Sequence, residues 1–368
     1  MRQSGQLLNV QIMRAIAAAL VVFGHAGQEM SLMAAKTGQS APNLEFFNWA
    51  WGVDIFFVIS GFIMMHTSSE HFGKPGASRE FIRRRLIRIV PLYWLTTTAF
   101  VLTALLAPKI LNVPPSSLWH GIASYAFIPE ANANGAVRPL LALGWTLNYE
   151  MFFYVLFALG MLLPLRKGLM TLCAIFVTLL SFGALGPWHN TQVDFWTSQL
   201  LAEVLLGVGR GLMARRGFAL NGLEALLLCA AGVAGAIIMG PLWAMEADIP
   251  ELARAGVPAA FLVTAAVLGP DVSRNKVTVW LAFVGDASFA LYLIHPFAIR
   301  PLREIWLRVA DGYLPMPLYL LAAVASAIAV AALVHLYVER PMTRALNAFG
   351  RAGAQPKTTG RTGALAPV

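Results

Sequence analysis

Apolar runs of about twenty residues follow one another along most of the chain, separated by short polar segments. A helix of about twenty residues spans the roughly 30 Å hydrocarbon core of a bilayer. The pattern therefore predicts an all-α fold, a polytopic membrane helix bundle of about ten transmembrane helices. We place the spans near residues 8–28, 48–67, 88–107, 142–164, 169–187, 195–213, 220–240, 254–270, 279–298 and 315–338.

Two stretches fall outside these spans. Leu118–Ile128 is apolar but too short to cross a membrane comfortably, so we expect it to be re-entrant or to lie at the interface. After Gly350 the sequence is rich in Gly, Thr, Ala and Pro, which predicts a disordered cytoplasmic tail over residues 350–368. Residues 1–349 then form one transmembrane domain. No internal repeat is evident, which weakens a transporter interpretation based on inverted halves.

The composition supports a membrane protein. Of the 368 residues, 58% are hydrophobic and only 12% are charged, about half the charged fraction of a soluble globular chain. Cys173 and Cys229 both lie within apolar runs, so we expect packed thiols and neither a disulfide nor a zinc site. The net charge of +9 comes from basic residues clustered between apolar runs, which suits membrane orientation and anionic headgroups. We therefore expect membrane lipids, and no nucleic acid, as partners.

Lysines and arginines are distributed unequally between the two sides of the predicted bundle. Their distribution favours both termini in the cytoplasm, by the positive-inside rule. The segment Arg300–Arg308 on the opposite side runs against this trend, as either a solvated face, which we favour, or a patch for an anionic acceptor. The apolar stretch Ala15–Gly24 also resembles a secretory signal, but the many later spans favour an uncleaved first helix.

The first predicted span carries two polar residues, Arg14 and His25, in an otherwise apolar helix. Eleven residues at about 100° each turn the helix by three full turns plus about 20°, so both side chains fall on one face, about 16 Å apart along the axis. A charge inside a membrane span is costly, and such residues usually face the bundle interior or a wet cavity. We therefore expect a functional site beside this helix.

A second candidate is the arginine-rich segment SREFIRRRLIRIVPLYW after the second span. Arg84 and Arg88 are four residues apart, and Arg85 and Arg88 are three apart, so on a helix they share a face and can converge on one polyanion. Guanidinium groups bind phosphates through paired donors. The alternative is a positive-inside anchor. The density of arginines, taken with His25, favours the phosphate site.

Carboxylates near the predicted outer end are candidates to act with His25. Asp54 in the second span either orients an imidazole or caps a helix. Glu150 in the run WTLNYEMFFY must be paired, hydrogen-bonded or protonated within the membrane. Its partner is either His25 or another donor in a structural pair. Glu339, at the end of the last span, is expected to pair with the arginine-rich segment.

Aromatic and polar residues of two further spans are candidates for substrate binding. Trp145, Asn148 and Tyr149 precede Glu150 in the fourth span, and Tyr292 and His295 lie in the run SFALYLIHPF of the ninth. An ordinary satisfied histidine is the default interpretation of the last of these. The chain has no His-Glu-x-x-His helix, no phosphate-binding glycine loop and no Gly-x-Ser-x-Gly elbow. We therefore predict no metal site and no permanently bound cofactor.

Together these segments resemble the acyltransferase 3 family of integral-membrane acyltransferases, which includes bacterial surface-polysaccharide O-acetyltransferases. The matching features are Arg14 with His25, GVDIFFVISGF, RRRLIRIVPLYW, WTLNYEMFFY, SFALYLIHPF and the terminal VERP. The resemblance implies a multi-pass enzyme of the bacterial inner membrane that transfers an acyl group from cytoplasmic acyl-CoA to a hydroxyl of a lipid-linked or exported sugar. It also implies roles for His25 and Arg14, and for the pair Arg85 and Arg88.

The residues and the resemblance give one mechanistic hypothesis. His25 acts as general base toward the acceptor hydroxyl, and Glu150 or Asp54 orients its imidazole. The phosphates of the donor, most simply acetyl-CoA, are held by arginines: Arg14, Arg84, Arg85 and Arg88. Relatives often carry an acidic pair after the fourth-span tryptophan, whereas here Met151 follows Glu150.

Two alternatives remain open at this stage. The first is a transporter or lipid-glycan flippase in which His25, Arg14 and Glu150 form a proton relay. The second is acyl transfer to a small molecule or a peptide. The sequence does not determine the oligomeric state.

Overall fold

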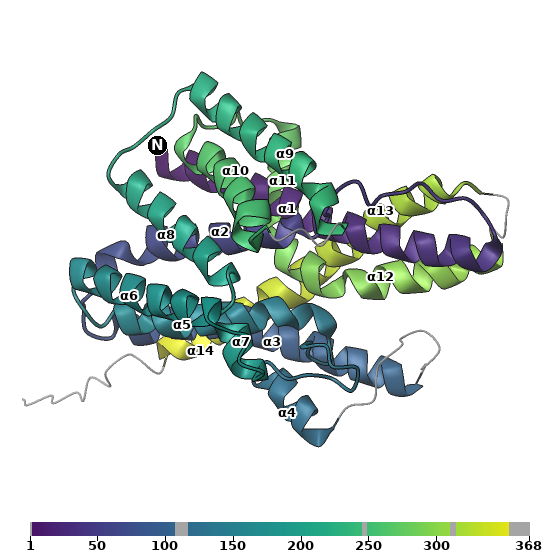
Figure 1. The fold of residues 1–368 in the computed structure, drawn as a ribbon, viewed down its shortest axis with the longest axis horizontal. Helices are drawn as coiled ribbons and strands as arrows, with labels where there is room; N and C mark the ends of the chain where they lie inside the picture. The colour runs from purple at the N-terminus through teal and green to yellow at the C-terminus, as the bar shows by residue number, and fades with distance from the viewer. Residues whose placement is uncertain (1, 107–116, 245–248, 310–313, 353–368) are drawn as a thin grey trace, which may run out of the picture.

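The computed structural model describes residues 2–106, 117–244, 249–309 and 314–352. Over these residues the chain is helical, with one isolated bridge between Ala131 and Val137, so the all-α prediction is confirmed (Figure 1). The helices are α1 (Arg2–Thr37), α2 (Trp51–Ser68), α3 (Ala77–Leu106), α4 (Leu118–Tyr125), α5 (Trp145–Gly160), α6 (Leu165–Ala184), α7 (Thr191–Trp196), α8 (Leu200–Arg215), α9 (Gly222–Ala244), α10 (Val257–Leu268), α11 (Lys276–Asp286), α12 (Ser288–Val309), α13 (Met316–Val334) and α14 (Arg340–Ala352). Short helical segments are η1 (Ser69–His71), η2 (Ala142–Gly144) and the π-helical η3 (Leu252–Gly256) and η4 (His335–Glu339).

Seven helices of the described part are long and apolar enough to cross a membrane, or eight when α11 and α12 count as one span. The sequence predicts about ten. The difference lies in the expected spans 195–213 and 254–270, which correspond to α8 and to the short helical stretch Leu252–Leu268. Both contain fewer residues than a typical spanning helix needs.

Helix boundaries also differ from the predicted ones. Helix α3 begins at Ala77 instead of residue 88, so the arginine-rich segment is the first part of the helix and not a loop. Glu80 accepts hydrogen bonds from Arg83 and Arg84, three and four residues ahead, and such pairs stabilise a helical turn. The predicted tail divides: residues up to Ala352 belong to α14, and residues 353–368 lie outside the described residues.

The ninth predicted span is a sharply bent pair of helices. Helix α11 ends at Asp286 and α12 begins at Ser288, with an angle of 75° between them. The Ala287 amide closes the end of α11 by donating to carbonyls of its last turn. As a result, the first turn of α12 starts inside the bundle, where Ser288 is fully buried.

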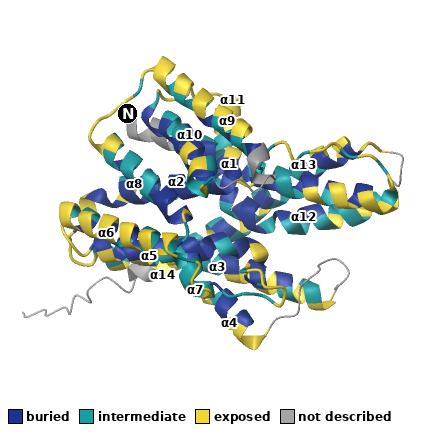
Figure 2. Ribbon diagram, in the orientation of Figure 1, coloured by how far each residue is buried: buried dark blue, intermediate teal, exposed yellow. Residues whose placement is uncertain are grey.

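Helix α1 lies at the centre of the bundle, against α2, α10, α11, α12 and α13 (Figure 1). The closest approach is to α11, where a Cβ added at Gly285 would lie 1.9 Å from the Gln11 carbonyl oxygen. Figure 2 shows α1 and α2 largely buried, while α6 and α9 carry many exposed positions. Most exposed side chains of α9 are apolar, including Leu223, Leu226 and Ile238, as expected of a face that contacts lipid.

Helices α2 and α8 make the most extensive helix pair in the bundle. A Cβ on Gly61 would lie 2.1 Å from the Val204 carbonyl oxygen, and one on Gly207 would lie 2.0 Å from the Val58 carbonyl oxygen. Only glycine permits such contact on both sides. Small residues that bring backbones together are typical of packing within membranes, where hydrophobic burial does not drive association.

Candidate functional site

A cavity of about 1080 Å³ opens at the end of the bundle where the arginines gather, between α1, α2, α3, α11 and α14. We call this cavity the vestibule. Its basic lining residues are Arg14, Arg84, Arg85, Arg88, Arg340 and Arg344. The four arginines predicted to hold a polyanion therefore face one space. Helix α14 contributes two more from the C-terminal end of the chain, which sequence analysis did not identify.

Carboxylates in the vestibule form ion pairs with only some of these arginines. Glu80 bonds Arg84 at 2.6 Å, and Asp286 lies 3.7 Å from Arg340. Glu339 accepts a hydrogen bond of 2.6 Å from Nδ1 of His335, so the predicted pairing of Glu339 with the arginine-rich segment is wrong. Within the described residues Arg88 forms no hydrogen bond or ion pair, so it is available to a ligand.

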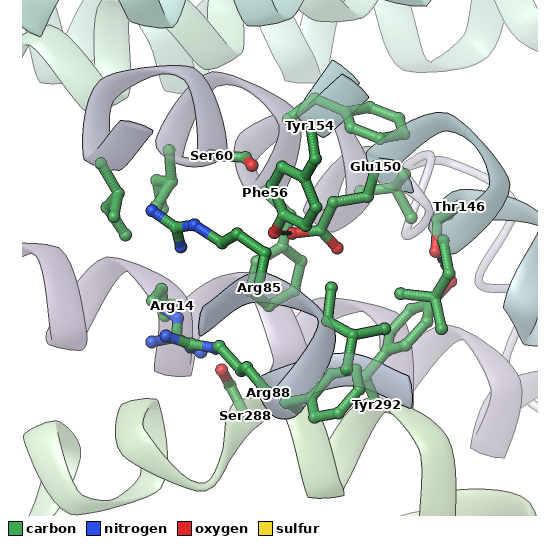
Figure 3. A pocket seen from close by; sticks show the side chains of 17 residues that line it. Arg14, Phe56, Ser60, Arg85, Arg88, Thr146, Glu150, Tyr154, Ser288 and Tyr292 are labelled. Carbon is green, nitrogen blue, oxygen red and sulfur yellow. Dashed lines mark hydrogen bonds between the residues drawn. The ribbon is translucent and has the colours of Figure 1, made fainter. Parts of the chain in front are cut away.

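A narrower chamber of about 100 Å³ continues inward from the vestibule. The two cavities share Arg14, Arg85 and Arg88, which therefore lie at their junction. Figure 3 shows the three guanidinium groups toward one end of the chamber, with Thr146 and Tyr292 toward the other. The chamber thus leads from a strongly basic mouth to a mostly neutral interior.

Glu150 lies in this chamber with the arginines and not beside His25. It accepts a short hydrogen bond from the Tyr154 hydroxyl. The Arg85 guanidinium lies over the rings of Tyr154 and Phe81, at 5.4 and 5.3 Å from their centroids. The structural alternative for Glu150 is therefore the one observed, because its partner is a hydroxyl donor on its own helix.

The inner end of the chamber is closed by hydrogen-bonded side chains. Tyr292 donates to the Leu143 carbonyl at 3.0 Å and accepts from the Thr146 hydroxyl at 3.0 Å. The Phe56 ring packs edge-on against Tyr292. Ser288 lines the chamber toward its other end, near Arg14 and Arg88 (Figure 3), and its buried hydroxyl has no hydrogen-bond partner in the described structure. Of the predicted substrate-binding residues, Tyr292 is the one that lines the chamber.

His25 lies beyond the inner end of the chamber and is not part of its lining. Its Nδ1 is 2.9 Å from the Val21 carbonyl oxygen, and its ring is 4.9 Å from that of His295 on α12. A carbonyl oxygen only accepts, so Nδ1 carries the proton and a neutral His25 has an unprotonated Nε2. The expected contact with Glu150 or Asp54 is absent among the described residues. The backbone of α1 orients this imidazole instead.

Asp54 faces a different partner. Its carboxyl group neighbours that of Glu203 on α8. Both residues are buried, and none of the surface of Glu203 is exposed. The expected roles of Asp54, orienting an imidazole or capping a helix, are not observed, because α2 turns this side chain toward α8. Neighbouring buried carboxyl groups repel each other when both are charged. No local sequence pattern indicates this pair, since Glu203 lies in a separate helix.

The aromatic cluster at the start of α5 lies outside the chamber. Trp145 packs under the Arg138 guanidinium, 4.5 Å from the ring centroid, and Tyr149 stacks on Phe195 at 3.8 Å. Burial lowers the pKa of Arg138 below its usual value. Asn148 is buried, and its side-chain oxygen has no partner in the described structure. These three predicted substrate-binding residues therefore form a separate cluster with Arg138.

Two arginines of the basic segment at the opposite end of the bundle are paired with carboxylates. Arg300 and Arg303 contact Glu29 of α1 at 3.2 and 2.5 Å, and Arg303 also contacts Glu304. These ion pairs link α1 to α12 close to His25. Arg300 and Arg303 are therefore occupied by carboxylates, while Arg308 is exposed.

Several residues that the fold brings to these cavities were not predicted from the sequence: Tyr154, Thr146, Phe56, Ser288 and His335. A usable signal existed for α12, where Ser288, Tyr292 and His295 recur at helical spacing and so share one face. Whether the remaining four residues reach the cavities depends on which helices are neighbours in the fold.

Comparison with known proteins adds an independent line of information. Residues 7–336 match a family described as an acyltransferase domain. A relative named exopolysaccharide production protein ExoZ, from Rhizobium meliloti (strain 1021), is 33% identical over 301 residues, which cover 80% of this chain and 90% of the relative. No solved structure matches significantly.

Proposed function

The chain belongs to the acyltransferase family whose domain it matches, and we propose that it moves an acyl group, most simply acetyl, from acyl-CoA to a hydroxyl of a lipid-linked or exported sugar. As a multi-pass membrane acyltransferase it needs a route by which a phosphate-bearing donor reaches the interior of the bundle. The observation that carries the proposal is the vestibule, whose arginines continue into the narrow chamber.

The vestibule suits the nucleotide end of acyl-CoA. Arginine binds phosphate oxygens through parallel N–H donors, and each bond to a charged group is worth about 1.5–3 kcal/mol. Because Arg88 and Arg14 line both cavities, we expect them to lie where the nucleotide gives way to the pantetheine arm. We infer that this end faces the cytoplasm, where acyl-CoA is made, with both termini on that side of a bacterial inner membrane.

The thioester must then reach His25. The arm would follow the chamber past Arg14 toward Tyr292, and His25 lies on the far side of that tyrosine. Movement of Tyr292 would therefore open the path. A neutral His25 with its proton on Nδ1 has Nε2 available to take the proton of the attacking hydroxyl. Such general base catalysis supplies about 10²–10⁴ in rate, and positioning of the two substrates must supply much of the remainder.

A sugar acceptor is supported by the relative named for exopolysaccharide production. His25 and its neighbours lie at the end of the bundle opposite the vestibule, which suits an acceptor that arrives from the outer side. The acceptor and the donor would then meet within the membrane. Glu150 is a candidate to interact with the donor arm at the chamber, since it faces the arginines and Tyr154.

Transfer in membrane vesicles tests the proposal. Inverted vesicles from a strain lacking the gene, complemented with each variant, are given [¹⁴C]acetyl-CoA, and label in extracted glycans is counted. Wild type should label the glycan, and His25→Ala should be folded and inactive. Arg166→Ala, an exposed arginine that lines neither cavity, serves as the control and should retain activity. Absence of label with wild type, together with no thermal stabilisation by acetyl-CoA, would favour a flippase.

A further inference from the structure

The two histidines that meet between α1 and α12 are arranged in the same way. His25 directs Nδ1 to the Val21 carbonyl, and His295 directs Nδ1 to the Leu291 carbonyl at 3.1 Å, each four residues back on its own helix. Because carbonyl oxygens only accept, both neutral rings carry their proton on Nδ1. Both therefore present an unprotonated Nε2.

His295 is completely buried, with 0% of its surface exposed. Its Nε2 has no hydrogen-bond partner in the described structure. A buried acceptor without a donor is destabilising, and such groups are rare in native proteins. In the described structure this nitrogen therefore lacks the hydrogen-bond donor that would stabilise it.

His25 can supply that donor once it is protonated. The ring centroids are 4.9 Å apart with a tilt of 48°, so the two imidazoles are direct neighbours. The charged groups that act on the pair from α1 and α12 are Glu29 and Arg300, which are bonded to each other. No carboxylate of the described residues contacts either imidazole. Glu29 acts on a charged His25 only through space, and His295 is the neighbouring ring with an acceptor nitrogen that is free in the described structure.

We propose that His295 is a positioning residue for the reaction, which accepts a hydrogen bond from His25 when His25 carries the proton taken from the acceptor. This inference rests on the proposed function, because it assigns His25 as the base. The hydroxyl O–H bond breaks as its oxygen bonds the thioester carbonyl carbon, the C=O π pair moves to the carbonyl oxygen, and the proton is held on His25 Nε2. The C=O bond then re-forms as the C–S bond breaks, the C–S electron pair leaves with sulfur, and the proton passes from His25 to the thiolate.

Two substitutions distinguish the effect of the acceptor nitrogen from the effect of the ring shape. His295→Phe keeps an aromatic ring but has no acceptor, and His295→Gln keeps an acceptor atom near the position of Nε2. In the vesicle assay with [¹⁴C]acetyl-CoA, we expect His295→Phe to lower kcat by about 10–100-fold, the loss of one hydrogen bond to a charged group. The KM for acetyl-CoA should stay unchanged, and His295→Gln should recover most of the rate.

The pH profile gives a readout that a purely structural role would not change. Without its acceptor, protonated His25 is less stable, so the fall of kcat at low pH should move to lower pH in His295→Phe. The control is His120→Phe, a buried histidine of α4 with Nε2 on the Arg138 carbonyl and a partnerless Nδ1 in the described structure, remote from the pair. It should keep the wild-type profile.

Rates are normalised to the folded enzyme recovered from each vesicle preparation. Wild-type kcat and pH profile in His295→Phe, with His25→Ala inactive, would overturn the role of His295 and leave the proposed function standing. An active His25→Ala would instead overturn the assignment of the base. Equal losses in His295→Phe and His295→Gln would also contradict the inference, because the acceptor atom would then be irrelevant.

Discussion

Arg88 and Arg85 line the same two cavities, yet their substitution by alanine should have different consequences. Arg88 has no hydrogen bond or ion pair among the described residues, and it shares its cavity with the like charge of Arg14. Its removal should change the stability of the free protein by no more than about 0.5 kcal/mol. Arg85 lies over Phe81 and Tyr154, and the loss of two such contacts should cost about 1–2 kcal/mol.

Donor binding should weaken in both variants. One lost contact to phosphate, at about 1.5–3 kcal/mol, raises the Kd for acetyl-CoA by about 10–150-fold. Ligand at about 100 times the wild-type Kd stabilises the folded protein by about 2.7 kcal/mol. After the substitution the same concentration should contribute only about 0.3–1.4 kcal/mol.

The assay is thermal unfolding of detergent-solubilised protein with and without acetyl-CoA. Arg88→Ala should melt like wild type without ligand and gain much less from the ligand, whereas Arg85→Ala should also melt lower without ligand. Full stabilisation of Arg88→Ala by acetyl-CoA would refute the assignment of the vestibule to the donor. A large loss of stability in the ligand-free Arg88→Ala protein would refute the view that this side chain has no structural partner.

Two further predictions concern packing and the closed end of the chamber. Gly207→Ala should destabilise the protein by about 1–3 kcal/mol, because its Cβ would lie 2.0 Å from a backbone carbonyl of α2. The control Gly209→Ala should be tolerated, because a Cβ at Gly209 faces open space. Equal melting temperatures of the two variants would contradict the close contact between α2 and α8. Tyr292→Phe should lower stability by about 1 kcal/mol by removing the buried hydroxyl that donates to the Leu143 carbonyl and accepts from Thr146, and the exposed Tyr337→Phe should have no effect in the same melting experiment.

Much of the architecture follows from local patterns in the sequence. The apolar runs predict the helices, because every backbone polar group within a membrane must be satisfied by its own segment. The spacing of Arg84, Arg85 and Arg88 correctly predicts that they face one space, since helical periodicity acts over a few residues. The boundaries of α3 were less predictable, because charged residues can continue a helix beyond the membrane when they pair with one another, as Glu80 does.

The Arg14–His25 prediction illustrates the limit of such local reasoning. Helical spacing places both residues on one face of α1, and each does face a polar neighbour. Arg14 lines the vestibule and the chamber, whereas His25 lies past Tyr292. The residue that separates them belongs to α12, which no periodicity within α1 can reveal.

The sequence by itself determined the helical class, the clustering of basic charge at one end and the family to which the chain belongs. The tertiary structure decided the partners: His295 for His25, Tyr154 for Glu150 and Glu203 for Asp54. The physical reason is that propensity and amphipathicity depend on near neighbours, while contacts between spans depend on how closely their surfaces fit. In this bundle the fit is set by glycines such as Gly207 and by the bend before Ser288, and these decide which polar side chains meet.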